Sequence, residues 1–116
     1  MRYAVSGSNS AAITPATASS AQNVLGKVIT SGRHFWLRGL SISPNATHGP
    51  LNIIDATTGG TATGPVVSIG LDPTVNQSIV VNFGAPGLLF KSGCVARLDA
   101  SGSIGIGLLS GWGYEE

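Results

Sequence analysis

The chain has 116 residues, of which 42% are hydrophobic and only 9% are charged, and its formal net charge is +1. This length predicts one domain, and the hydrophobic share argues against disorder throughout. The basic residues are scattered, the single cysteine excludes an internal disulfide and a multi-cysteine zinc site, and no window has the apolar length of a membrane helix, so we expect no nucleic-acid partner and no membrane.

The low share of charged residues is the most unusual feature of this composition, since an ordinary soluble domain has about 25%. A soluble monomer uses surface charge to stay apart from its neighbours. We therefore expect Ser, Thr, Asn and Gly to cover much of the surface, and an assembly to bury part of it. No secretory signal follows Met1, so we expect synthesis and assembly in a reducing cytosol.

Residues 1–22 are predicted to form an extended or flexible N-terminal arm. Residues 6–22 are nearly all small and polar, and neither a helical nor an alternating apolar period runs through them. Such a segment either stays disordered or becomes ordered against a partner subunit, and both alternatives are open. In the second case Ile13 and Pro15 are the candidate contact residues.

Residues 23–116 are predicted to form a β-sandwich, because short runs of β-forming residues alternate with turn residues from Val24 onward. We expect about eight strands, at 24–30, 34–43, 51–56, 66–71, 77–83, 88–90, 94–99 and 103–109. No segment combines helix caps with a sustained helical period. The first expectation is an all-β, antiparallel, jelly-roll-like sandwich, and the second is an immunoglobulin-like sandwich.

The strongest of these strands, 34–43, has apolar residues on both faces. Strict alternation divides them between the faces, with Phe35 and Leu37 on one and Leu40 and Ile42 on the other. Either this strand is central and covered on both sides, or it is bent at Gly39.

No set of side chains has the spacing of a catalytic or metal site. His34 and His48 are the candidate bases, but a nucleophile would be an arbitrary choice among many serines. Paired carboxylates would have to come from Asp55, Asp72 and Asp99, of which the last two stand beside turns and fit a turn-forming role. We therefore expect no enzyme, no metal and no cofactor, although a metal site shared between subunits is left open.

The aromatic residues Trp36, Trp112 and Tyr114 have two interpretations. In the first they pack in the core or at an edge of the sandwich. In the second they form a stacking platform for a sugar, and the candidate polar partners are then Glu115, Glu116 and Asn52.

Three segments of the chain carry short motifs that can be compared with known proteins. A strand of the pattern L-R-G-ϕ-x-ϕ stands at residues 37–42, after a Ser/Thr/Ala/Gly-rich N-terminus. A strand with a central Asp55 and a glycine-rich loop follows at 52–60. The third segment, at 86–98, has the pattern P-G-ϕ-ϕ-F-x-x-G-ϕ-x-ϕ-x-L, and a last strand ends in aromatic residues near the C-terminus.

With these motifs the chain resembles short virion proteins that several phage genomes encode. This resemblance spans about residues 24–114 and departs from the pattern in the glycines of the last strand and in the length of the tail after Leu109. It implies a β-sandwich that coats or joins other virion proteins. The first expectation is a capsid decoration (cement) protein, bound as a homotrimer to the major capsid protein on the virion surface and assembled in the host cytoplasm. The alternatives are a tail, neck or fibre-base component and a carbohydrate-binding sandwich module. The residues expected to contact a partner are Ile13, Pro15, Trp36, Arg38, Trp112 and Tyr114.

Overall fold

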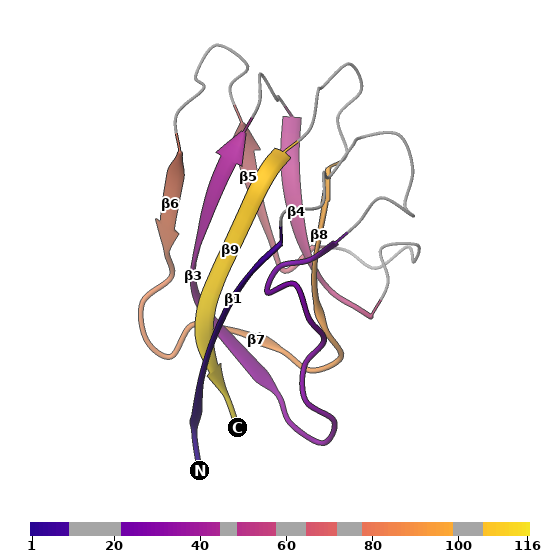
Figure 1. Cartoon of the computed structure of the whole chain (residues 1–116), viewed down its shortest axis with the longest axis vertical. Helices are drawn as coiled ribbons and strands as arrows, with labels where there is room; N and C mark the ends of the chain where they lie inside the picture. The colour runs from indigo at the N-terminus through magenta and orange to yellow at the C-terminus, as the bar shows by residue number, and fades with distance from the viewer. Residues whose placement is uncertain (10–21, 45–48, 58–64, 72–77, 99–105) are drawn as a thin grey trace.

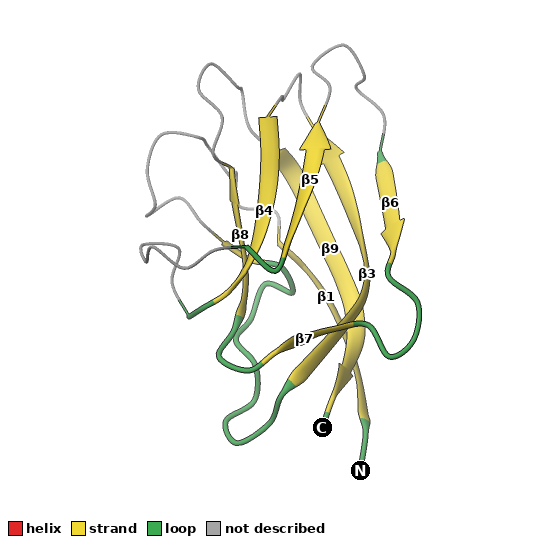
Figure 2. Ribbon diagram, turned by 180° about the vertical axis from the view of Figure 1, so that it is seen from behind, coloured by secondary structure: helices red, strands yellow, loops and turns green. Residues whose placement is uncertain are grey.

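The structure is a computed structural model that describes residues 1–9, 22–44, 49–57, 65–71, 78–98 and 106–116. In these residues it contains two antiparallel sheets (Figures 1 and 2), built from eight strands of three or more residues and one strand of two. In chain order they are β1 (Tyr3–Asn9), β2 (Gln22–Asn23), β3 (Phe35–Pro44), β4 (Gly49–Asp55), β5 (Val67–Leu71), β6 (Ile79–Asn82), β7 (Leu88–Phe90), β8 (Cys94–Leu98) and β9 (Ile106–Glu115). The prediction of an all-β, antiparallel, sandwich-like domain is confirmed. Within the described part of the chain, no helix is long and apolar enough to cross a membrane.

Each sheet combines strands from the first half and the second half of the chain. Five nested pairs join the two halves of the chain: β1 with β9, β2 with β8, β3 with β6, β3 with β7, and β4 with β5. Two further pairs, β3 with β9 and β4 with β8, place these nested pairs side by side in the two sheets. The result is a five-stranded sheet in the order β1-β9-β3-β6, with β7 also on β3, and a four-stranded sheet in the order β2-β8-β4-β5. Both chain termini lie at the same end of the sandwich (Figure 1).

Seven of the eight predicted strands are present, as β3 to β9, but the predicted strand at 24–30 is wrong. The chain turns there, because the Gly26 amide donates to the Asn23 carbonyl at 3.0 Å and Gly26 has a left-handed φ of 71°. Val24 and Leu25 are nevertheless core residues, with 0% and 5% exposure. The sequence therefore predicted that these two residues are apolar parts of the sandwich, but it did not predict that they lie in a turn.

Strand β1 lies within the segment that was predicted to be an arm. It pairs with β9 along its whole length, so residues 3–9 belong to the five-stranded sheet. Val5 packs against the core, while the alternate residues of β1 are small and face outward. Residues 10–21, which include Ile13 and Pro15, lie outside the described residues.

A β-bulge in β3 explains why this strand has apolar residues in both phases of the alternation. The register with β9 shifts between Leu37 and Gly39, so β3 has one residue more than its partner. The extra residue reverses the alternation after Arg38. As a result Phe35, Leu37, Leu40 and Ile42 all face the core with 0% exposure. Of the two interpretations of the strand at 34–43, the irregularity at Gly39 is the one that the structure shows. The apolar residues of both phases face one core, so the strand is not covered by apolar packing on both sides.

The hydrophobic core lies between the two sheets. The five-stranded sheet and its edges contribute the largest side chains, among them Phe35 and Phe90, whose ring centroids are 6.4 Å apart. The four-stranded sheet contributes Leu51, Ile53 and Ala96. Each large aliphatic or aromatic side chain buried here contributes roughly 1.5–3 kcal/mol. Because the inner faces hold this core, the outer faces are left for other roles.

Candidate functional site

The outer face of the five-stranded sheet carries serines in one half and aromatic side chains in the other. The alternation that buries Leu40, Ile42 and Leu109 turns their neighbours outward. We call the first group the serine half, and its members are Ser8, Ser41, Ser43, Ser78 and Ser110. We call the second group the aromatic half, and its members are Arg2, Trp36, Arg38, Asn82, Trp112 and Tyr114. The aromatic half lies toward the end of the sandwich where both termini lie (Figure 1).

The serine half is uncharged, and its hydroxyls bond to one another. Ser110 of β9 stands opposite Ser8 of β1 and Ser41 of β3. The Oγ atoms of Ser8 and Ser110 are 2.9 Å apart, and those of Ser43 and Ser78 are 3.3 Å apart. Beside these serines, Val80 is 66% exposed and Leu108 is 41% exposed. The surface therefore combines paired hydroxyls with exposed apolar side chains.

In the aromatic half, Tyr114 is covered from two sides. It stands opposite Trp36 in the register of β3 and β9, and the two rings stack with centroids 6.3 Å apart and planes at 21°. The Arg2 guanidinium carbon lies 4.7 Å from the Tyr114 ring centroid. Arg2 also faces Glu116, with 3.9 Å between Nε and Oε2, an exposed pair that contributes little to stability. This packing leaves Tyr114 only 7% exposed although it points away from the core.

Trp112 lies over a glycine on the neighbouring strand. It stands opposite Gly39, and a side chain at that position would overlap the Cζ2 atom of the Trp112 indole. The bulge therefore does two things: it returns Leu40 to the core, and it places a residue without a side chain under the indole. Trp112 is half-buried as a result.

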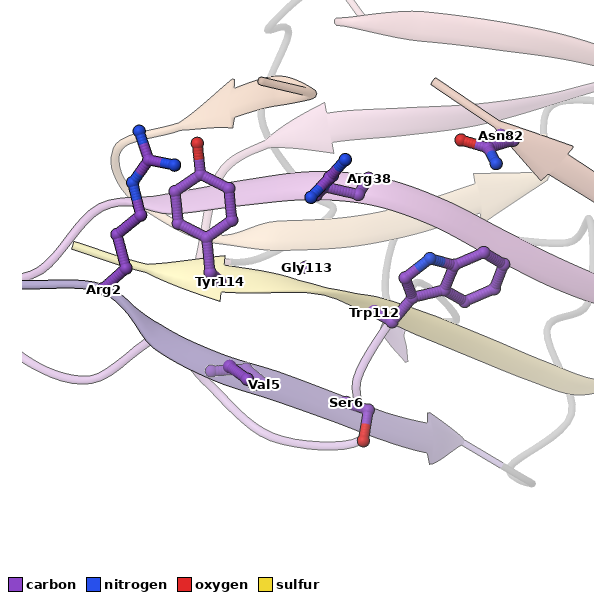
Figure 3. Close-up of a pocket in the computed structure, with 9 residues that line it drawn as sticks. Arg2, Val5, Ser6, Arg38, Asn82, Trp112, Gly113 and Tyr114 are labelled. Carbon is purple, nitrogen blue, oxygen red and sulfur yellow. The ribbon is translucent and has the colours of Figure 1, made fainter. Parts of the chain in front are cut away.

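A groove of about 630 Å³ runs across the aromatic half between β1 and β6. We call it the aromatic groove, and its polar and aromatic lining consists of Arg2, Ser6, Arg38, Asn82, Trp112 and Tyr114 (Figure 3). Its volume falls within the range of roughly 300–1,000 Å³ that small-molecule sites occupy.

The turn that follows β6 holds two of these side chains in place. Arg38 Nε donates to the Gly84 carbonyl at 3.4 Å, and the Gly84 amide donates to Asn82 Oδ1 at 2.9 Å. The Arg38 backbone carbonyl also accepts a hydrogen bond from the Phe83 amide at 2.8 Å. Within the described residues, the other guanidinium N–H groups of Arg38 and the indole N–H of Trp112 have no protein acceptor. The groove therefore presents free hydrogen-bond donors.

Four of the residues predicted to contact a partner, Trp36, Arg38, Trp112 and Tyr114, lie together on this face. The polar partners suggested for a sugar platform are mostly elsewhere. Glu115 is only 3% exposed on the opposite side of β9, where its Oε2 lies 3.5 Å from Arg33 Nη1, and Asn52 belongs to the four-stranded sheet. Glu116 is the one that reaches the aromatic half, through Arg2.

Arg2 and Asn82 were missed by the sequence reasoning. Arg2 precedes a strand that the sequence pattern did not reveal, and Asn82 reaches the site only because β6 pairs with β3. Pairing between strands so far apart in the chain leaves no local signal.

The two candidate catalytic residues that the structure describes, His34 and Asp55, make different contacts. His34 is exposed, and its backbone amide and carbonyl pair with those of Glu116 at 3.0 and 2.9 Å. Asp55 accepts hydrogen bonds from three successive backbone amides, those of Lys91, Ser92 and Gly93, so its carboxylate holds the turn between β7 and β8. His48, Asp72 and Asp99 lie outside the described residues. Among the residues that the structure describes, no three His, Cys, Asp or Glu side chains form a group that could hold a metal ion.

Cys94 is buried in the core opposite Asp55 of β4. Burial raises the pKa of its thiol well above the ordinary 9.0, and the negative charge of Asp55 adds to this. We expect the folded protein not to react with Ellman's reagent at pH 8 and the urea-unfolded protein to release one equivalent, because the thiolate is the reactive species.

The same pKa shift predicts a loss of stability in alkali. The unfolded chain releases the thiol proton above pH 9.0 and the folded chain retains it, so the free energy of unfolding should fall by up to about 1.4 kcal/mol per pH unit there. Urea denaturation at pH 8 to 10.5 measures this slope, with Cys94→Ala as the control that lacks it. An equal slope in the two proteins would contradict the assignment to Cys94.

The chain matches no protein-family model, no curated protein and no solved structure. Its function is therefore argued from the geometry of the site. The aromatic groove offers guanidinium, amide, hydroxyl and indole groups around an aromatic ring, and the described residues that line it include no carboxylate. Such a set has the chemistry to bind a ligand by hydrogen bonds and stacking.

Proposed function

We propose that this chain is a structural component of a phage particle, namely a decoration (cement) protein that binds the major capsid protein shell as a homotrimer. The observation that carries the proposal is the serine half of the five-stranded sheet. Burying a charge in an interface is costly, and burying a hydroxyl that is already hydrogen-bonded costs much less. A face of paired serines with Val80 and Leu108 exposed beside them is suited to broad contact with another protein.

In this proposal many weak contacts, repeated over the shell, supply the binding strength. The chain has no catalytic activity and no cofactor, and it contacts neither nucleic acid nor membrane. It is assembled onto the virion in the host cytoplasm. The scarcity of charged residues, 9% of the sequence, supports a protein that buries much of its surface in contacts.

We further propose that the sandwich is a jelly roll. The five nested pairs and the two pairs that join them side by side support this, because an eight-strand jelly roll has the same pairs when β6 and β7 together take the place of one strand. Viral capsid proteins and lectins both use this architecture. Residues 10–21 follow β1 and precede β2 in the chain. We propose that Ile13 and Pro15 in this segment contact a neighbouring capsid subunit, as expected of the N-terminal arm.

Imaging and quantification of the purified particle test the virion position. We expect cryo-electron microscopy to show density for the chain over the whole shell, and mass spectrometry to give a fixed ratio to the major capsid protein. Density at a single vertex would instead support the tail, neck or fibre-base alternative. Absence of the chain from purified particles would contradict any virion role.

A charge placed within the serine half should weaken capsid binding. We expect Ser110→Glu to lower the affinity of the purified protein for undecorated capsids about tenfold or more, since the new carboxylate would be buried without a partner. Cosedimentation with capsids measures the binding. Ser31→Glu is the matched control, because it adds the same charge at an exposed turn outside this face. Equal binding by the two variants, with both folded by circular dichroism, would show that another face meets the shell.

A second candidate function, a carbohydrate-binding module, is favoured by a different observation. The aromatic groove places Trp112 beside Arg38 and Asn82 on an outer sheet face. An aromatic ring surrounded by polar groups is the arrangement that a sugar ring requires, because its C–H face stacks on the ring and its hydroxyls need hydrogen-bond partners. A glycan array tests this candidate, and no bound glycan would dispose of it.

A further inference from the structure

We propose that the aromatic groove binds an acidic saccharide, with an anionic group of the sugar held by Arg38 and a sugar ring placed on Trp112. The inference rests on the carbohydrate-binding candidate and names its ligand class. It does not depend on the position of the chain in a virion.

Arg38 is the group that selects an anion. It is exposed, and among the described residues its one side-chain hydrogen bond runs from Nε to the Gly84 carbonyl at 3.4 Å. This bond fixes one nitrogen of the guanidinium and leaves the two terminal nitrogens to bind a ligand. The structure gives Arg38 no acidic partner within the described residues. A guanidinium with two free nitrogens matches the two oxygens of a carboxylate or a sulfate.

Arg2 has a smaller part in this recognition. Its guanidinium lies over the Tyr114 ring and faces Glu116, so its charge is partly compensated. Among the described residues, the lining of the groove nevertheless contains two cations, Arg2 and Arg38, and no carboxylate. A ligand with negative charge is therefore favoured over a neutral ligand, and a cationic ligand is disfavoured.

Trp112 supplies the surface for the sugar ring. Its indole is supported from below by the backbone of Gly39, and it lines the groove as a half-buried side chain. The indole N–H has no acceptor within the described part of the chain, so it is free to donate to a hydroxyl or ring oxygen. Ser6 and Asn82 stand on the two sides of the indole, on β1 and β6, and provide further polar groups (Figure 3).

The same features argue against a nucleic acid as the ligand. A nucleic acid presents a phosphate at every nucleotide and requires a row of cations along its path. The aromatic groove has two cations, and one of them faces a carboxylate. Two cations and one accessible ring are suited to a short ligand with few charges.

The test is a titration of the purified full-length chain, followed by two-dimensional ¹H–¹⁵N NMR, with trigalacturonic acid and with its neutral counterpart galactotriose. The chain has two tryptophans, so it gives two indole N–H signals. We expect trigalacturonic acid to shift the Trp112 signal more than the Trp36 signal, and to bind about tenfold or more tightly than galactotriose. Added sodium chloride should weaken this binding, because the site is open to solvent.

Variants of Arg38 provide the decisive comparison. We expect Arg38→Gln to weaken binding of trigalacturonic acid about tenfold or more, and Arg38→Lys to restore part of the loss, since lysine keeps the charge without the planar fork. Lys27→Gln is the matched control: it removes the same charge from an exposed residue that does not line the groove, and its affinity should stay within about twofold.

Any of three results would overturn the inference. The first is equal affinity for trigalacturonic acid and galactotriose, and the second is equal affinity of Arg38→Gln and the unchanged chain for trigalacturonic acid. The third is that inorganic phosphate binds as tightly as trigalacturonic acid. The last would mean that the groove recognises an anion and not a sugar. A negative sugar titration would not contradict the decoration role, because that role is measured on particles. Absence of the chain from particles would not contradict the binding of an acidic saccharide.

Discussion

Replacement of Gly113 by alanine is expected to destabilise the protein by about 3 kcal/mol, which lowers the thermal midpoint by about 10 °C. A Cβ atom at Gly113 would overlap the backbone carbonyl oxygen of Trp36 on β3 and would lie 3.1 Å from Phe35 Cε1. The carbonyl belongs to the β3·β9 ladder at the centre of the five-stranded sheet, and Phe35 is 0% exposed in the core. Neither neighbour can move aside without breaking hydrogen bonds or opening a cavity.

The matched control is Gly70→Ala on β5. Gly70 is also a strand glycine, but a Cβ atom there would have no heavy atom within 4 Å. We expect the free energy of unfolding of this variant to stay within about 0.5 kcal/mol of the unchanged protein. Urea denaturation followed by circular dichroism measures both variants. Equal stability of the two variants would show that β3 and β9 are not packed as closely as described.

The sequence predicted the interior strands well because their alternation is a local property. Strands β4 to β8 are short runs of apolar and polar residues that fit a half-buried sheet wherever they pair. Strand β1 gave no such signal, since Val5 is its one large residue that packs against the core. It is held by β9, at the other end of the chain, for example where Ser8 meets Ser110. A strand that depends on its partner more than on its own composition is not visible to a local pattern.

The candidate site was predicted as single residues and not as an arrangement. Trp36, Arg38, Trp112 and Tyr114 were chosen for their chemistry, and the register of β3 against β9 brings them to one face. That register includes a bulge, and the shift of one residue decides which side chains face outward. The sequence allowed a bend at Gly39, but it did not show that an indole from β9 lies over that glycine.

Two segments of the sequence, the second at 52–60 and the third at 86–98, bear on the fold more than on the site. Asp55 of the second segment accepts hydrogen bonds from the backbone of the third, at Lys91 to Gly93. Gly93 has no room for a side chain, because a Cβ atom there would overlap the Ala56 carbonyl. These residues therefore define a structural joint between β4 and the β7–β8 turn. Residues of this kind maintain the fold, whereas the ligand or partner is set by the outer face.

Replacement of Asp55 by alanine is the second change with a large expected effect, a loss of about 2–3 kcal/mol. Asp55 Oδ1 accepts from the amides of Lys91, Ser92 and Gly93 at 3.1, 2.8 and 3.2 Å, and Oδ2 accepts from Lys91 at 3.0 Å. Hydrogen bonds to a charged acceptor are stronger than those between neutral groups. Water can replace the carboxylate at the exposed Lys91 and Ser92 amides, which limits the loss, but the Gly93 amide is part-buried. Urea denaturation measures the total loss.

Hydrogen exchange distinguishes this mechanism from general damage to the fold. Under native conditions we expect the amides of Lys91, Ser92 and Gly93 to exchange faster in Asp55→Ala by a larger factor than those of β9, because the turn loses its acceptor while the opposite sheet keeps its own ladder. Asp55→Asn keeps one acceptor oxygen without the charge and should lose about 1 kcal/mol. Glu116→Ala is the control for loss of a carboxylate, since its pair with Arg2 is exposed, and it should change stability by less than about 0.5 kcal/mol. If Asp55→Ala were as stable as Glu116→Ala, the carboxylate would not hold the turn.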